Sequence, residues 1–201
     1  MTVAAVLDRA PREVMDDLKA RYAEPQRSYH VWRHIEALLG WAEEVQPTLA
    51  DADAVILAIL FHDAVYDPTR SDNESESARL LEGASLDAFS AVSRVRAVRM
   101  VEATSRHEVP IDVVPADRDD LSKFLDMDLS ILGASEPVFD GYEAAVREEY
   151  AFVPEPIFRA GRRRILQGFL ERPVLYFSDW GRDRFEVAAR ANLTRSIAAL
   201  A

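Results

Sequence analysis

Apolar side chains recur along most of the chain at spacings of three and four residues, the period that predicts helices with one buried face. No segment shows the sustained alternation of apolar and polar residues that is typical of a strand, and RPVLYFSDWG (172–181) is the only segment that suits an extended conformation. The pattern therefore predicts an all-α fold of about eight or nine helices. The predicted helices cover residues 11–23, 30–46, 51–65, 73–83, 87–106, 118–132, 136–151, 155–171 and 183–200.

The segment DADAVILAILFHDAVY (51–66) is apolar around almost its whole circumference, so its helix should run through the middle of the domain. This helix ends in His62 and Asp63. A buried carboxylate beside a buried imidazole is costly unless a positive charge compensates it, and a metal cation is the strongest candidate for that charge. A neighbouring Arg or a helix-cap interaction is the alternative.

Length and composition predict one globular domain over residues 1–201. The chain has 201 residues, 49% hydrophobic and 29% charged, which is enough to bury a core and is the usual mix of a folded protein. A formal net charge of -11 argues against partners such as nucleic acid or an anionic membrane. Because there is no cysteine, disulfides and thiolate metal sites are excluded. The N-terminal segment lacks a signal-peptide core, so we expect a cytoplasmic location.

The histidines at positions 30 and 34 are four residues apart, which on a helix places both rings on one face. His34 falls inside the apolar stripe of the predicted helix and His30 at its edge, so we expect His34 to be buried and His30 to lie near the rim. An ordinary pair of core or surface histidines is the alternative.

Two carboxylates in the segment LDMDL, Asp126 and Asp128, compete for a place in the core. Apolar positions at 121, 124, 125, 129 and 132 define the stripe of the predicted helix. Asp128 falls within about 30° of the stripe centre, whereas Asp126 lies about 130° away, among polar positions. The pattern therefore predicts that Asp128 faces inward and that Asp126 does not.

The order of one His, a His-Asp pair and a distant Asp resembles the HD superfamily of metal-dependent phosphohydrolases. The resemblance extends over most of the chain, to a bacterial branch of predicted phosphohydrolases without an assigned substrate. It implies a single HD-type helical domain with a divalent metal in its core, held by His34, His62, Asp63 and Asp128. The segments that carry the resemblance are FHDAVYDPTRSDNESESA, FLDMDLSILG, REEYAFVP, FRAGRRRILQGFLERP and ARANL.

The segment YHVWRH (29–34) is also similar to the HN-x-x-H signature of cyclic-nucleotide phosphodiesterases, with Val31 in place of the Asn. In that signature the first histidine protonates the leaving group and the second binds metal. The resemblance therefore implies that His30 is the general acid and that Asp63 is the second catalytic residue. A neutral imidazole suits this role because it titrates near the working pH.

Two imidazoles and two carboxylates form a mixed nitrogen and oxygen site that suits one Mn, Fe, Co, Ni, Zn or Mg ion. Such an ion acidifies water and offsets charge on phosphoryl oxygens, so we expect hydrolysis of a phosphomonoester or phosphodiester in a small substrate such as a nucleotide. The alternative is a non-catalytic HD module that binds metal and nucleotide and acts through a protein partner. The sequence leaves a homodimer open.

His107 and Arg163 are the candidate substrate contacts outside the metal site. His107 could contact phosphate or bind a second metal, or it could equally be a solvated histidine at a helix end. The three consecutive arginines at 162–164 point in different directions on a helix, so at most one or two can face a single site. A guanidinium matches phosphate in a bidentate way, and Arg163 is the candidate contact, while a solvated face is the alternative for these arginines.

Overall fold

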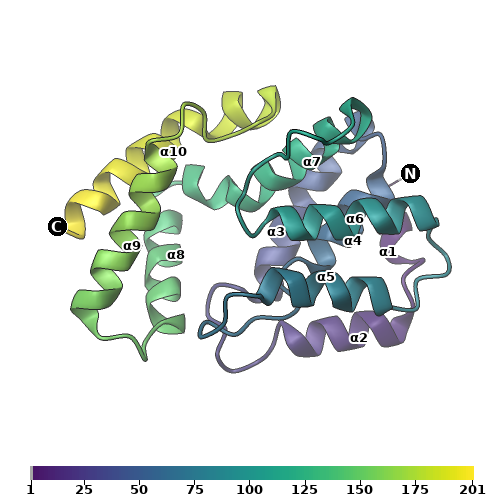
Figure 1. Ribbon diagram of the computed structural model, residues 1–201, viewed down its shortest axis with the longest axis horizontal. Coiled ribbons are helices and arrows are strands. Elements are labelled where there is room, and N and C mark those ends of the chain that lie inside the picture. Colours follow the sequence, from purple (N-terminus) through teal and green to yellow (C-terminus); the bar gives the residue numbers. More distant parts are fainter. Residues whose placement is uncertain (1) are drawn as a thin grey trace. The chain divides into compact units, whose positions relative to one another are not determined.

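The computed structural model describes residues 2–201, apart from the side chain of Ala116, and every regular element in this range is helical (Figure 1). The predicted all-α class is therefore confirmed for the described residues. In the segment considered extended, residues 172–178 form an irregular loop and residues 179–181 begin the last helix. The helices are α1 (Val3–Leu7), α2 (Arg12–Arg21), α3 (Trp32–Val45), α4 (Ala52–Phe61), α5 (Asn73–Gly83), α6 (Ala91–Ala103), α7 (Pro115–Asp128), α8 (Glu136–Glu149), α9 (Glu155–Leu170) and α10 (Asp179–Ala199), with 3₁₀ turns η1 (Gln46–Thr48) and η2 (Leu129–Gly133).

The chain divides into two compact units, Met1–Met127 and Asp128–Ala201. The boundary falls at the last residue of α7, so the first unit holds α1 to α6 with nearly all of α7, and the second holds η2 with α8 to α10. The organisation of the whole chain as one domain stays a prediction.

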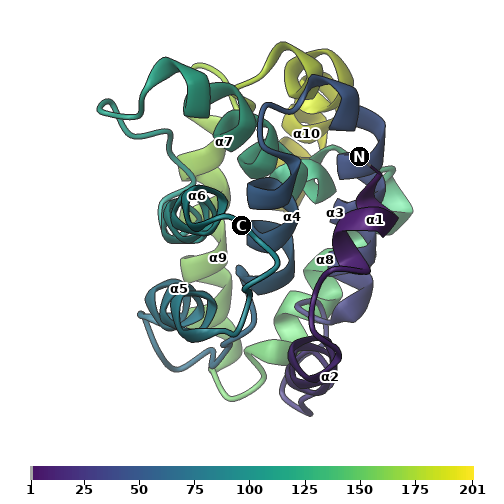
Figure 2. The ribbon, with the colours of Figure 1, turned by 90° about the vertical axis from the view of Figure 1, so that its right-hand side faces the viewer.

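The helix α4 is the centre of the first unit, where it packs against α1, α3, α5 and α6. Figure 2 shows α4 between α3 and α6. All residues from Ala54 to Phe61 are at most 1% exposed, which confirms the prediction of a helix buried on every side. Each large aliphatic side chain buried in this way contributes about 1.5–3 kcal/mol. The position of this helix therefore determines where its C-terminal residues lie in the core.

The start of α4 is held by two carboxylates. Asp51 is the N-cap, with its side chain accepting from the amide of Ala54 at 3.0 Å, and it also pairs with Arg96 at 2.9 Å. Asp120 on α7 accepts from the amides of Ala50 and Asp51 at 3.0 and 2.7 Å. Burial raises the pKa of Asp120 above its ordinary value although both amides act in the opposite direction. The bonds to the amides of Asp51 and Ala54 satisfy groups that the start of a helix leaves without partners, and the bond to Ala50 fixes the residue before the cap.

The second unit is organised around the contact between η2 and α10. Tyr176 is fully buried and its hydroxyl donates to the carbonyl of Leu129 at 2.9 Å, while the amide of Asn192 donates to the carbonyls of Leu132 and Ala134 at 2.9 and 2.8 Å. A Cβ at Gly133 would meet the Cβ of Phe185 at 2.7 Å, so only glycine permits this approach. In Figure 1, α8 and α9 run side by side and α10 lies along α9.

Several helix ends differ from the sequence prediction, and capping explains two of them. Ser90 accepts from the amide of Ser93, so α6 begins four residues later than the predicted range, and Ser178 accepts from the amide of Gly181, so α10 begins four residues earlier. The short helix α1 was not predicted, because its five residues are too few for a period to be recognised.

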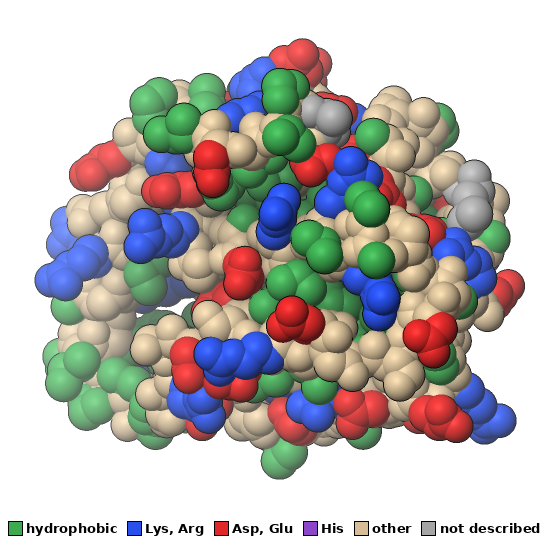
Figure 3. Space-filling view, turned by 45° about the vertical axis from the view of Figure 1, so that its right-hand side comes forward, with side chains coloured by type: hydrophobic (Ala, Val, Ile, Leu, Met, Phe, Trp, Pro, Cys, Tyr) green, Lys and Arg blue, Asp and Glu red, His purple; other side chains and the backbone are tan. Residues whose placement is uncertain are grey.

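The surface carries mixed charge. On the face seen in Figure 3, acidic and basic side chains are interspersed and no histidine is in view. Among residues 2–201, no helix combines the length and the apolar character that a bilayer-crossing segment needs.

We predict that Asp51→Ala lowers the free energy of unfolding by about 1–2 kcal/mol, because the substitution removes the helix cap. Chemical denaturation followed by far-UV circular dichroism measures the change. Asp72→Ala is the matched control: Asp72 is the N-cap of α5 in the same unit but makes no cap bond, and its exposed carboxylate pairs with Arg70. The control should change stability by less than about 0.5 kcal/mol. Equal losses in the two variants would contradict the role given to the cap.

Candidate metal centre

The imidazole of His62 lies at the C-terminal end of α4 and is 1% exposed. Its Nδ1 is 3.0 Å from the carbonyl oxygen of Ile59. A carbonyl only accepts hydrogen bonds, so we assign the ring proton to Nδ1. In the neutral form of His62, Nε2 is therefore an acceptor. The end of the apolar helix thus orients one ring nitrogen toward the backbone and the other into the site.

Three candidate ligand atoms converge beside this ring. The Nε2 of His62 is 2.9 Å from Oδ2 of Asp63 and 3.2 Å from Nε2 of His34, and the remaining separation, between His34 and Asp63, is 3.8 Å. An imidazole lone pair and a carboxylate oxygen at such distances repel each other unless a proton or a metal cation lies between them. The geometry therefore requires positive charge at the point where the three atoms meet.

His34 is oriented in the same way by a tyrosine. It lies in the first turn of α3 and is 7% exposed, and its Nδ1 is 3.2 Å from the hydroxyl of Tyr29. The tyrosine thus holds the Nδ1 side of the ring, and Nε2 faces His62. Metal-bound histidines in proteins are commonly held through their second nitrogen in this manner.

The donor set fits a divalent metal. Bonds of about 2.0–2.1 Å in tetrahedral geometry place two ligand nitrogens about 3.3 Å apart, and the two histidine nitrogens are separated by 3.2 Å. The side chain of Asp63 is 20% exposed, so the cluster reaches the surface on the carboxylate side and is not sealed in the core. The three residues His34, His62 and Asp63 can hold a metal ion, as the sequence predicted for these three.

His30 does not share a helix with His34, and the prediction that both project from one helical face is wrong. The helix begins only at Trp32, because Val31 is extended, with φ -110° and ψ 170°, and donates its amide back to the carbonyl of Tyr29. The expected difference in burial is confirmed, since His34 is buried and His30 half-buried. The ring of His30 stacks on Tyr66 with centroids 4.2 Å apart, and its centroid is 6.4 Å from that of His34.

The prediction that Asp126 in LDMDL faces away from the core is also wrong. Asp126 is fully buried and Asp128 is only half-buried. The stripe argument fails because every residue from 121 to 127 is buried, so this part of α7 has no solvent face on which a polar residue could lie. Asp128 is the first residue of the second unit, and its assignment as a metal ligand stays a prediction.

His107 lies in the loop after α6 with a positive φ of 46°, a conformation that few residues other than glycine adopt. The neighbouring residues Arg106 and Glu108 line a cavity of about 700 Å³ together with Arg99 and Met100. None of the three cluster residues lines this cavity, and His107 is not part of the cluster. Its proposed contact with phosphate or a second metal stays a prediction.

Of the three arginines on α9, Arg162 is the one that turns inward. It pairs with Glu143 on α8 and donates to the hydroxyl of Tyr142 at 2.7 Å. Burial alone would lower the pKa of Arg162, but Tyr142 and Glu143 outweigh it and raise the pKa above its ordinary value. Arg163 is exposed in the second unit, and its contact with phosphate stays a prediction.

Sequence reasoning missed the residues that contact and orient the candidate site residues. Tyr29 orients His34, Tyr66 stacks on His30, and Arg27 bonds the backbone of the His30 and Asp63 segments. Only the position of Tyr29, next to His30 in YHVWRH, gave a signal. Comparisons of the chain with protein-family models, with curated proteins and with solved structures each gave no match.

We predict that the protein binds about one divalent ion and that Asp63→Ala abolishes this binding, because the substitution removes the only carboxylate of the cluster. Elemental analysis of metal-loaded and desalted protein measures the metal content. Asp87→Ala, which changes an exposed carboxylate of the same unit, should keep the ion. Equal metal content in Asp63→Ala and the unaltered chain would remove the site.

Proposed function

We propose that this protein is a metal-dependent phosphohydrolase of the HD type, which cleaves a phosphomonoester or phosphodiester in a small molecule such as a nucleotide. The observation that carries the proposal is the convergence of three ligand atoms: Nε2 of His62 lies 2.9 Å from Oδ2 of Asp63 and 3.2 Å from Nε2 of His34. A metal cation at that point would satisfy all three atoms, and the sequence resemblance supplies the class of reaction. Asp128 is the fourth ligand in the proposal.

A divalent ion bound there supplies Lewis-acid chemistry, which acidifies water and offsets charge on phosphoryl oxygens. His34 and His62 hold their Nε2 atoms toward the site because Tyr29 and the carbonyl of Ile59 occupy the opposite ring nitrogens. Asp63 contributes negative charge on the exposed side of the cluster.

His30 is the proton donor to the leaving group in this proposal. Its half-buried ring leaves it accessible to a substrate, and the stack on Tyr66 restricts its rotation. Histidine is suited to the role because both of its protonation states are populated near neutral pH. Arg163 and His107 are the candidate contacts to the phosphate.

We predict that the protein hydrolyses members of a nucleotide and phosphoester panel in the presence of Mn²⁺, Co²⁺, Ni²⁺, Zn²⁺ or Mg²⁺, with release of phosphate or of the cleaved alcohol as the readout.

His30→Ala should keep the metal and lower turnover by about 10²–10⁴-fold, the usual contribution of a general acid. His34→Ala should lose the metal. If His30→Ala also empties the site, His30 is a ligand and not the acid.

The same experiment separates the enzyme from a binding module. If the unaltered chain binds metal and nucleotide but releases no product with any member of the panel, the phosphohydrolase proposal fails and a non-catalytic HD module is supported. If the chain binds no divalent metal at all, both fail, since each depends on the ion.

We predict that Asp128→Asn weakens metal binding by more than about tenfold, since a ligand contributes at least as much as an outer-shell partner. Asp126→Asn should keep the metal and lower thermal stability, because Asp126 lies on α7 and is fully buried. Titration of both variants with Co²⁺, combined with thermal melting, tests the pair. The reverse pattern would transfer the ligand role to Asp126.

A further inference from the structure

Arg27 lies between α2 and α3 with a side chain that is 0% exposed. Its Nη1 donates to the carbonyl of Asp63 at 2.7 Å and to the carbonyl of His30 at 3.1 Å, and its Nη2 donates to the carbonyl of Ala64 at 3.1 Å. Its Nε donates to Glu24 at 3.2 Å. A single guanidinium thus connects two segments that are more than 30 residues apart and that each carry a residue of the candidate site.

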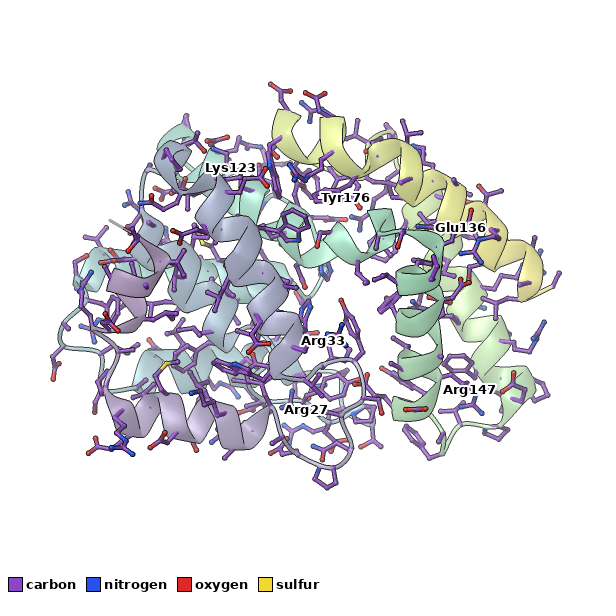
Figure 4. The ribbon with its side chains drawn as sticks, turned by 180° about the vertical axis from the view of Figure 1, so that it is seen from behind. Arg27, Arg33, Lys123, Glu136, Arg147 and Tyr176 are labelled. Atoms are coloured by element: carbon purple, nitrogen blue, oxygen red, sulfur yellow. The ribbon has the colours of Figure 1, made fainter. Side chains whose placement is uncertain are left out.

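Aromatic rings enclose this guanidinium. The central carbon of Arg27 lies 5.1 Å from the ring centroid of Tyr22 and 5.3 Å from that of Tyr66, within the range of cation–π attraction. The ring of Tyr66 also stacks on His30. Figure 4 shows Arg27 among the loops near the start of α3. The side chain is therefore fixed in position as well as in its hydrogen bonds.

We propose that Arg27 is a positioning residue for the metal and the general acid: it sets the distance between the His30 segment and the turn that carries Asp63. The inference rests on the proposed function, because it concerns the same site. The planar guanidinium of arginine has donors in fixed directions. It therefore fixes the relative positions of the three backbone carbonyls that it binds, those of His30, Asp63 and Ala64. Arg27 touches neither metal nor substrate in this proposal.

The carbonyls that Arg27 binds distinguish this role from general support of the fold. They belong to Asp63, to its neighbour Ala64 and to His30. All three carbonyls that accept from the guanidinium therefore lie in the two segments that carry His30 and Asp63. The His30 segment also contains Tyr29, which orients His34. Loss of the fork therefore releases the backbone on both sides of the cluster.

The test compares Arg27→Met and Arg27→Lys with Arg162→Met in the full chain. Arg162 is the matched control, since it is also a buried arginine with a carboxylate partner and a tyrosine ring 5.0 Å away, but it belongs to the second unit. Each protein is titrated with Co²⁺ below its melting temperature, and its visible spectrum is recorded.

Arg27→Met should bind Co²⁺ about 10- to 100-fold more weakly, the usual effect of losing an outer-shell partner, with an altered spectrum. Arg27→Lys should recover only part of the affinity, because an ammonium group cannot reproduce the fork. Arg162→Met should lower the melting temperature and leave Co²⁺ affinity and spectrum unchanged. The proposal is overturned if Arg27→Met binds like the unaltered chain, or if Arg162→Met weakens binding equally.

A readout without metal separates this inference from the proposed function. In metal-free protein labelled at histidine, the nuclear Overhauser contact between the rings of His34 and His62, whose centroids are 5.2 Å apart, should be lost in Arg27→Met and kept in Arg162→Met. If the unaltered chain binds no Co²⁺, the proposed function fails, and the ring contact alone decides whether Arg27 positions the cluster. An unchanged ring contact in Arg27→Met then refutes the positioning role.

Discussion

The burial of α4 on every side is the constraint from which the candidate site follows. A helix with no solvent-exposed face must have its last carbonyl groups satisfied by protein donors, because water does not reach them. Two side chains meet this need: Nδ1 of His62 donates to the carbonyl of Ile59, and the hydroxyl of Tyr22 donates to the carbonyl of Leu60 at 3.1 Å. The first of these bonds fixes the tautomer of His62, so the chemistry of the site is a consequence of ending an apolar helix inside the core.

The same burial makes a compensating positive charge, a proton or a metal cation, important at the cluster. Acceptors that face one another in a weakly solvated site repel more strongly than they would in water, and removing a compensating charge from such a site is costly. His34 and His62 are both nearly inaccessible, whereas Asp63 keeps a fifth of its side chain at the surface. That asymmetry gives the cluster one side that reaches the surface.

Sequence reasoning succeeded where one physical effect dominated. The apolar circumference of residues 51–61 predicted a central helix. The position of His62 at the end of that helix predicted that His62 is buried. It failed where two effects compete. The 3.6-residue period placed His30 on the helix of His34. The backbone at Val31 is extended, however, so the helix begins only at Trp32, after His30. The period also placed Asp126 outside, whereas neighbours cover α7 on all sides there, and coverage by distant segments leaves no trace in a local pattern. Arg27 could not be recognised, because its partners in the site segments are backbone carbonyls, and any residue provides one.

Arg27 lies close to a site proposed to hold a cation, and the arrangement avoids the conflict through the choice of its partners. An arginine next to a carboxylate commonly forms a bidentate ion pair, which would neutralise the charge that a metal needs. Here the fork binds the peptide carbonyl of Asp63, while the carboxylate Oδ2 lies 2.9 Å from Nε2 of His62. The peptide group and the side chain of Asp63 thus have different partners, and the faces of two tyrosine rings stabilise the guanidinium charge. Apart from its bond to Glu24, which is not one of the three cluster residues, the guanidinium is directed to neutral carbonyls and aromatic faces, so it can organise a cation site without competing for the carboxylate of Asp63.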